Sequence, residues 1–156
     1  MDQTISELTD SERTWISAQL EGAVRFIDKF SPRDAGQPLS LVGLDRAFAA
    51  WIASGPTDVQ AINETINFVG IAFGRCLVED VGLKWVIATD QYGSDLAVHG
   101  LPGTGDVLIY PANFVAKRWE RRETGFLESS FRDIERDVAE LDRQWRKPER
   151  PWWKLW

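Results

Sequence analysis

The chain holds one cysteine and one histidine, and together they could form a nucleophile and its base. Cys76 would react as a thiolate after His99 had accepted its proton. Cys76 precedes Leu77 at the border of an apolar helix face, where a free cysteine is usually a buried structural residue. His99 ends a strand directly before Gly100, which favours a solvated edge position. We therefore predict no catalytic residues from this pair.

Carboxylates around the ends of the central strands are the second group that could do chemistry. They are Glu79, Asp80, Asp90, Asp95 and Asp106. Such groups could hold a metal ion or transfer protons, but loop aspartates usually form turns, and DQYGSD lacks the ligand register of a calcium loop. The single histidine also excludes a multi-histidine site. We predict no metal and no cofactor, and keep as an alternative an enzyme whose site lies among Asp90, Asp95, Asp106 and Tyr92.

The C-terminal stretch RQWRKPERPWWKLW combines tryptophans with basic residues. Tryptophan and arginine are favoured anchors at protein interfaces, so Trp152, Trp153 and Trp156 are candidate binding residues. The same composition suits an anionic membrane surface, which is a second alternative. In a third interpretation the indoles fold back over residues 107–110 or over a helix junction, because free aromatic ends promote aggregation.

Composition excludes several classes of protein. A chain of 156 residues with 44% hydrophobic and 27% charged residues fits one globular domain with a core of its own. The net charge of −6 argues against a nucleic-acid-binding protein, which needs a basic face. The polar, acidic start of the chain has no signal-peptide pattern, and no apolar run is long enough to span a membrane. We therefore expect a cytoplasmic protein.

The positions of these residues depend on a predicted helix–sheet–helix core. Gly82 ends a helix, and Lys84–Asp90 and Ser94–His99 alternate with a period of two around the turn at Gly93. A third strand, 107–110, leads through Pro111 into a helix over 112–121. We predict a three-stranded antiparallel meander.

The residues of this core resemble a small bacterial family, domain of unknown function 3806. The resemblance is carried by FGRCLVEDVGLKWVIATDQYGSDLAVHG and LIYPANFVAKRWE. The shared features are a glycine-containing helix, a Gly-x-x-Trp entry to a strand, an Asp-x-Tyr-Gly turn, and an apolar strand that runs through proline into a Lys-Arg helix. The resemblance implies an α+β domain and no activity.

Helices are predicted on both sides of this core. A capping box at Thr9 and Glu12 starts a helix over 11–30, Ser40 caps a second, and Thr57 or Asp58 caps a third that continues to Val81. A last helix begins at Leu127 with an apolar stripe to Trp145. The fold class is thus α+β, with about five helices around the sheet. One domain, 1–156, comprises a helical part (1–58), the core (59–122) and a C-terminal helix with its tail (123–156).

Two glycines four residues apart, Gly70 and Gly74, predict a close crossing of the third helix by another helix or by the sheet, with a backbone contact to a ligand as the alternative. The function we predict is a non-enzymatic protein-interaction module, and a guarding role toward a bacterial effector is one form of it. The expected contacts are Tyr92, His99, Lys117, Arg118 and the tryptophan tail, in a monomer or homodimer with an unidentified protein partner.

Overall fold

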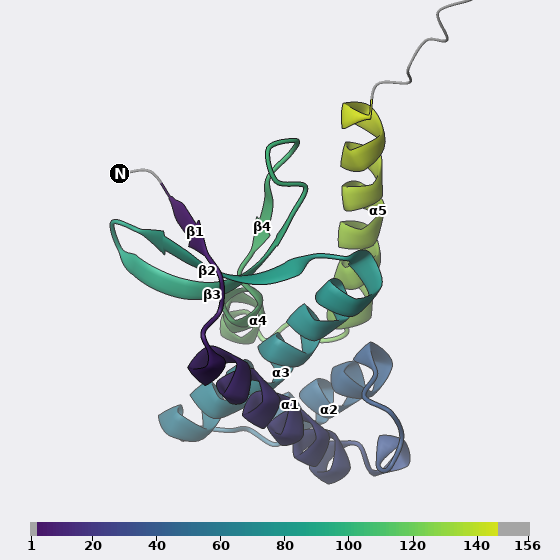
Figure 1. The fold of residues 1–156 in the computed structure, drawn as a ribbon. Coiled ribbons are helices and arrows are strands. Elements are labelled where there is room, and N and C mark those ends of the chain that lie inside the picture. Colours follow the sequence, from purple (N-terminus) through teal and green to yellow (C-terminus); the bar gives the residue numbers. More distant parts are fainter. Residues whose placement is uncertain (1–2, 147–156) are drawn as a thin grey trace, which may run out of the picture.

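The computed structural model describes residues 3–146, which form an α+β fold with one antiparallel sheet (Figure 1). The sheet has four strands in the order β1 to β4. They are β1 (Thr4–Ser6), β2 (Lys84–Asp90), β3 (Gly93–Gly100) and β4 (Val107–Ile109). The three predicted strands are confirmed, but the prediction of three strands in all is wrong, because β1 is a fourth. β1 escaped prediction because its three residues are all exposed and too few to show a period of two.

The five predicted helices are present. They are α1 (Asp10–Phe30), α2 (Leu41–Ala53), α3 (Val59–Cys76), α4 (Pro111–Glu120) and α5 (Leu127–Trp145). Side chains cap their first turns as expected: Glu12 accepts from the Thr9 amide at 3.0 Å, and Ser40 accepts from the Gly43 amide at 3.0 Å. Such caps satisfy backbone N–H groups that have no partner within the helix.

The end of α3 differs from the prediction of one α-helix to Val81. The α-helix ends at Cys76, and Leu77–Val81 form a single π-helical turn. Gly82 then adopts a φ of +86°, a left-handed conformation that glycine takes without strain. The predicted stop at Gly82 is therefore confirmed, and the last turn is wider than a regular helix.

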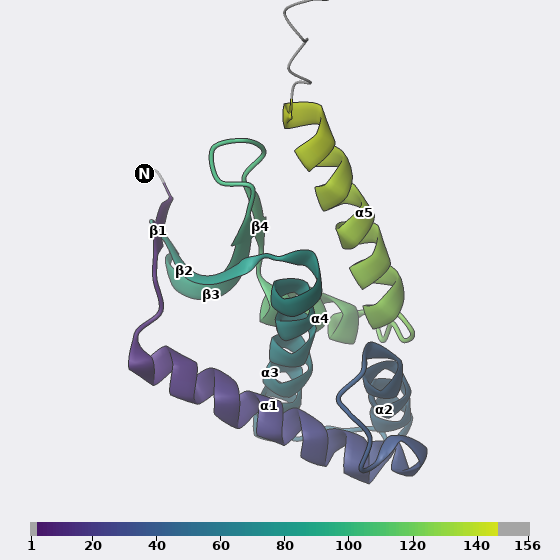
Figure 2. The same ribbon diagram turned by 45° about the vertical axis from the view of Figure 1, so that its right-hand side comes forward.

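α3 packs across α1, and both helices contact the inner face of the sheet, which lies above α1 in Figure 2. The α3 side chains Val69, Ile71 and Phe73 are fully buried. A Cβ on Gly70 would lie 2.7 Å from the Cα of Ala112, and one on Gly74 would overlap the Trp85 ring. The predicted close crossing is confirmed, because α4 approaches α3 at Gly70 and the Trp85 side chain of β2 approaches it at Gly74.

The two faces of the sheet are covered differently. On the inner face Trp85, Ile87 and Leu96 pack against Leu8, Ile16 and Ile71. On the outer face Val86, Ala88 and Ala97 are buried under their neighbours Leu108 and Tyr110.

Tyr110 also reaches the far edge strand on that outer face. Its hydroxyl lies 2.5 Å from Nε2 of Gln3, a residue next to β1. Because the sheet order separates β4 from β1 by two strands, the tyrosine side chain spans the face between them. The small side chains of Ala88 and Ala97 leave room for it.

α5 carries its predicted apolar stripe on a helix that packs against the rest of the fold only in part. Val138 is buried, Phe131 and Ile134 are half-buried, and the Trp145 residue is 58% exposed. In Figures 1 and 2 the helix starts beside α2 and extends past the loop that joins β3 to β4. Its first turn is therefore anchored more firmly than its last.

Candidate functional site

β3 has an open edge along its first half. β2 pairs with β3 from Gly93 to His99, whereas β4 pairs only with Val98, His99 and Gly100. The chain leaves the sheet after Ile109, because Pro111 has no N–H for a ladder and its fixed φ suits the first turn of α4. Within residues 3–146, Gly93–Ala97 therefore have a neighbouring strand on one side only. Such an edge presents backbone N–H and C=O groups that can pair with another chain.

A groove of about 540 Å³ follows this edge. It lies where the sheet, α1, α3 and the first turn of α4 meet. Its lining residues are Trp15, Asn67, Ile71, Ala88, Asp90, Gly93, Asp95, Leu96, Tyr110, Ala112 and Asn113. We call this site the sheet-edge groove. It wraps around the strand, since Leu96 belongs to the inner face of the sheet and Ala88 to the outer face.

The base of the sheet-edge groove is apolar. Ile71 is buried and Leu96 is half-buried, and both belong to the small hydrophobic cluster between the sheet and α1. Trp15 on α1 is 40% exposed, although it belongs to the apolar stripe of its helix. A large exposed indole beside an apolar base offers contact area to a ligand at little entropic cost.

The rim of the groove is acidic. Asp90 accepts a hydrogen bond from the Tyr92 amide at 2.7 Å, which fixes the hairpin turn, and Asp95 is exposed beside it. Asp95 stands opposite Ala88 and Asp90 opposite Gly93, so both carboxylates project from the outer face. None of the described residues that line the groove is Lys, Arg or His. The field in the groove therefore favours a cationic group.

Two carboxamides lie on the helical side of the same groove. Asn67 is on α3 and Asn113 is in the first turn of α4. Asn67 is half-buried and Asn113 is exposed. Each carries a donor and an acceptor, and so can bond to a peptide backbone from the side opposite β3.

A family model described as "Domain of unknown function (DUF3806)" matches residues 49–131, about half of the chain. The chain belongs to this family. The resemblance seen in the sequence is thereby confirmed. Comparison with curated proteins and with solved structures finds no match.

The DUF3806 match covers most of the sheet-edge groove. It runs from the middle of α2 into α5, so that it contains α3, three of the four strands and all of α4. Of the residues that line the groove, Trp15 alone lies outside it. The groove is therefore built almost entirely from the part of this chain that defines its membership of the DUF3806 family.

The predicted contact residues lie apart from the groove lining. Tyr92 is at the hairpin tip and 89% exposed, and Lys117 is exposed in the second half of α4. His99 contacts Asp106, with Nε2 and Oδ1 3.4 Å apart, and is largely shielded rather than a solvated edge residue. Trp152, Trp153 and Trp156 lie outside the described residues.

Asp106 shapes the loop before β4. It accepts from the Gly103 amide at 3.1 Å, and this bond together with His99 lowers the pKa of the carboxyl. Asp106 is not among the residues that line the sheet-edge groove, whereas Asp90 and Asp95 are. The three carboxylates of the alternative enzyme site are thus divided between two places, and Asp90 and Asp106 hold turns.

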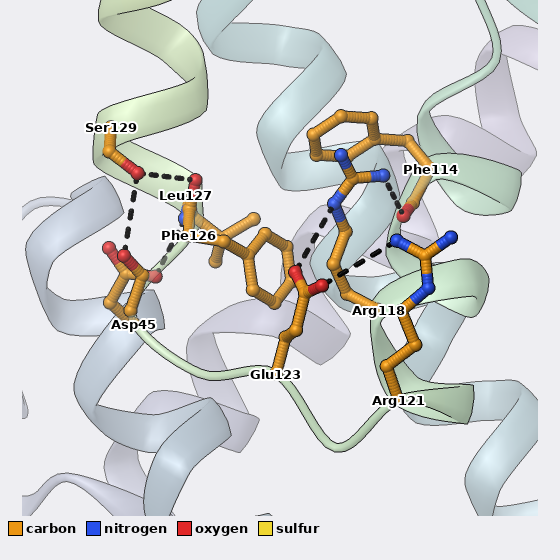
Figure 3. A network of polar contacts seen from close by, with 9 residues as sticks. Asp45, Phe114, Arg118, Arg121, Glu123, Phe126, Leu127 and Ser129 are labelled. Atoms are coloured by element: carbon orange, nitrogen blue, oxygen red, sulfur yellow. Dashed lines mark hydrogen bonds and ion pairs between the residues drawn. The ribbon is translucent and has the colours of Figure 1, made fainter.

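Arg118 is a structural residue at the junction of α4 and α5 (Figure 3). Its guanidinium stacks on the Phe114 ring at 3.5 Å from the centroid and donates to the Phe114 carbonyl at 3.1 Å. Glu123 lies 3.9 Å from it as an ion pair. Burial lowers the pKa of Arg118. Because these contacts occupy the side chain, Arg118 serves the fold.

Asp45 anchors the start of α5 in the same view (Figure 3). Its two carboxylate oxygens accept from the backbone amides of Leu127 and Glu128, at 2.8 and 3.1 Å. These amides belong to the first turn of the helix and have no partner within it. Partial burial raises the pKa of Asp45, and the two hydrogen bonds oppose that rise.

Cys76 and His99 do not form a pair. Cys76 lines a second groove between α2, α3 and α5, together with Asp80 and Glu128, whereas the imidazole of His99 contacts Asp106. Burial and the nearby carboxylates raise the pKa of Cys76 to about 11, so the thiol is protonated at neutral pH. Residues 3–146 contain no cluster of three or more His, Cys, Asp and Glu suited to a metal ion. Nor do they contain a helix that could span a membrane.

Sequence reasoning missed three groove residues, Trp15, Asn67 and Asn113. Trp15 follows the helical spacing of the apolar residues of α1, which predicts a buried side chain, but it is 40% exposed. Asn67 had a usable signal, since it is a lone carboxamide inside the apolar run Ile66 to Phe73. No sequence signal marks Asn113, because its place in the groove lining depends on where α4 begins relative to β3.

Proposed function

We propose that this member of the DUF3806 family is a non-enzymatic protein-interaction module that binds a polypeptide segment in the sheet-edge groove. The observation that carries the proposal is the open edge of β3, which runs along a groove of about 540 Å³. Backbone groups at an open strand edge recognise another polypeptide in several peptide-binding domains. A groove with an apolar base and a few polar groups on its rim is also the usual form of a binding site.

The chemistry at the groove supports binding more than turnover. Asp90 is engaged with the Tyr92 amide, and the described residues that line the groove include no Ser, Thr, Cys, Lys or His and no cluster suited to a metal ion. Trp15, Asn67 and Asn113 are groups that bind peptides through stacking and hydrogen bonding. The partner is therefore a protein, and its recognition requires no chemical step.

The proposal is tested by selecting random 12-residue displayed peptides on the immobilised full-length chain. We expect enriched peptides whose affinity falls at least tenfold in Trp15→Ala, because this change removes the exposed indole wall of the groove. Tyr92→Ala is the matched control, since Tyr92 is an exposed aromatic residue outside the groove lining. It should leave the affinity unchanged.

Both variants should keep the circular dichroism spectrum and melting temperature of the native chain within a few degrees. If selection enriches no peptide above the uncoated support, the proposed function is wrong. It is equally wrong if the enriched peptides bind the native chain and Trp15→Ala alike while Tyr92→Ala abolishes binding.

A further inference from the structure

The groove lies where β4 would continue if it paired with the whole length of β3. β4 pairs with β3 at Gly100, His99 and Val98 and then leaves the sheet, while β3 continues to Gly93 without a neighbour on that side among the described residues. We propose that the bound segment adds to β3 as an extended strand along Gly93–Ala97 and places a lysine or arginine beside Asp90 and Asp95. This inference rests on the proposed function and names its binding mode and ligand class.

The space along the edge suits one added strand. An added strand would lie about 4.8 Å from β3, in the gap that Tyr110, Ala112 and Asn113 border on the other side. Five residues of β3 extend over about 17 Å at 3.4 Å per residue. A segment of five or six residues therefore fills the groove, and the carboxamide of Asn113 can bond to its outer backbone edge.

Side chains of an added strand alternate between the two faces of the sheet. Those on the inner side meet Trp15, Ile71 and Leu96, which are apolar. Those on the outer side meet Asp90 and Asp95, with no basic residue in the lining to compete. The ligand thus has apolar and basic residues at alternating positions.

Charge sets the choice of ligand and its register, and the backbone supplies the affinity. Exposed ion pairs in proteins contribute little free energy, so the two carboxylates alone do not hold a peptide. They do discriminate, because an acidic residue at the same position meets two like charges. A basic segment is also steered toward the whole chain by its net charge of −6.

The first experiment measures backbone pairing. Peptides selected on the full-length chain are resynthesised with single N-methyl groups at each position in turn, and affinities are measured by fluorescence anisotropy. An added strand donates to β3 at every second residue only. We therefore expect losses of at least tenfold at alternate positions and changes below threefold at the positions between them.

The second experiment measures charge recognition. The affinity of the selected peptide should fall about fivefold or more in Asp95→Lys, and a peptide with its basic residue changed to glutamate should recover affinity for that variant. Asp133→Lys is the matched control, because it changes the same charge on the exposed face of α5. It should leave the preference for a basic peptide intact.

Each outcome identifies what fails. Peptide binding that Trp15→Ala weakens would support the proposed function. If the losses on N-methylation then do not alternate along the peptide, or if Asp95→Lys does not reverse the charge preference, this binding mode is wrong while the proposed function stands. If no peptide binds, the proposed function itself fails. If a peptide of residues 147–156 displaces the selected peptides at equal or lower concentration, the occupant is the chain's own C-terminal segment, and a foreign ligand is excluded.

Discussion

A Cβ atom added to Gly70 on α3 would lie 2.7 Å from the Cα of Ala112 in the first turn of α4. Real Cβ atoms essentially never approach backbone so closely, and neither helix backbone can yield as a side chain can. This contact sets the place where α4 begins, and Ala112 and Asn113 then form one wall of the sheet-edge groove. A glycine outside the groove lining thus determines its width.

Replacing Gly70 with alanine should therefore destabilise the protein. Helix propensity alone would favour the change by about 1 kcal/mol, whereas overpacking of this kind costs about 1–3 kcal/mol. We expect a net loss of about 1 kcal/mol in the free energy of unfolding, measured by urea denaturation, together with weaker peptide binding. A stability gain would show that α3 and α4 are not in contact at this glycine.

Arg118 should contribute to stability and not to binding. Arg118→Ala loses the stack on Phe114 and the bond to its carbonyl, and we expect the free energy of unfolding to fall by about 1–2 kcal/mol. Arg118→Lys should recover only part of this, because the ammonium is not planar. Lys117→Ala, one residue away and exposed, should change stability by less than about 0.5 kcal/mol. Equal losses in Arg118→Ala and Lys117→Ala would contradict the structural role.

Asp45 should give stability a pH dependence of known sign. Its pKa is raised in the folded chain, mainly by burial, so the protonated form is favoured by folding. Its contribution is complete below the ordinary carboxyl pKa of 3.8 and is lost as pH rises through the higher folded value. The stability of the native chain relative to Asp45→Asn should therefore decline between about pH 3 and pH 6. A relative stability that rises over this range would refute the assignment.

Asp45→Ala tests the capping role separately. Losing acceptors for the Leu127 and Glu128 amides should cost about 1–2 kcal/mol and fray the first turn of α5. Amide hydrogen exchange can localise the effect. Faster exchange at the start of α5, with α1 unaffected, is the expected pattern.

The thiol of Cys76 should react slowly in the folded chain. With a pKa of about 11, its thiolate fraction at pH 8 is roughly two orders of magnitude below that of a free cysteine. Alkylation by iodoacetamide, followed by mass spectrometry, should accelerate about tenfold per pH unit up to pH 10. The denatured chain is the control and should react rapidly at pH 8. A rate that levels off below pH 9 in the folded chain would mean an activated thiol.

Local sequence signals are sufficient to predict the five helices and the strands β2, β3 and β4. The alternation of side chains over Lys84–Asp90 predicts β2, and Gly82 predicts the end of the preceding helix. Both features depend on residues close together in the sequence. β1 was beyond such signals, since Thr4–Ser6 form a strand only because residues 87–89 pair with them. Tertiary pairing of this kind leaves no periodic trace in three residues.

The groove was predictable only in fragments. Asp90 and Asp95 stand out as carboxylates near a turn, but the open edge of β3 beside them depends on where β4 stops relative to β3. Arg118 and Tyr92 are predicted as contact residues from their charged and aromatic types. In the structure Arg118 packs at the junction of α4 and α5, and Tyr92 lies at the hairpin tip. Residue type alone does not reveal whether a side chain is already occupied by its own fold.

A nuclear magnetic resonance titration of the ¹⁵N-labelled full-length chain with a selected peptide tests the central claim most directly. We predict that amide shift changes concentrate on Gly93–Ala97 and on the side-chain amide of Asn113, with contacts between backbone protons of the peptide and β3. Shift changes centred on the second groove, at Phe131 and Glu135, with β3 unchanged, would contradict the account.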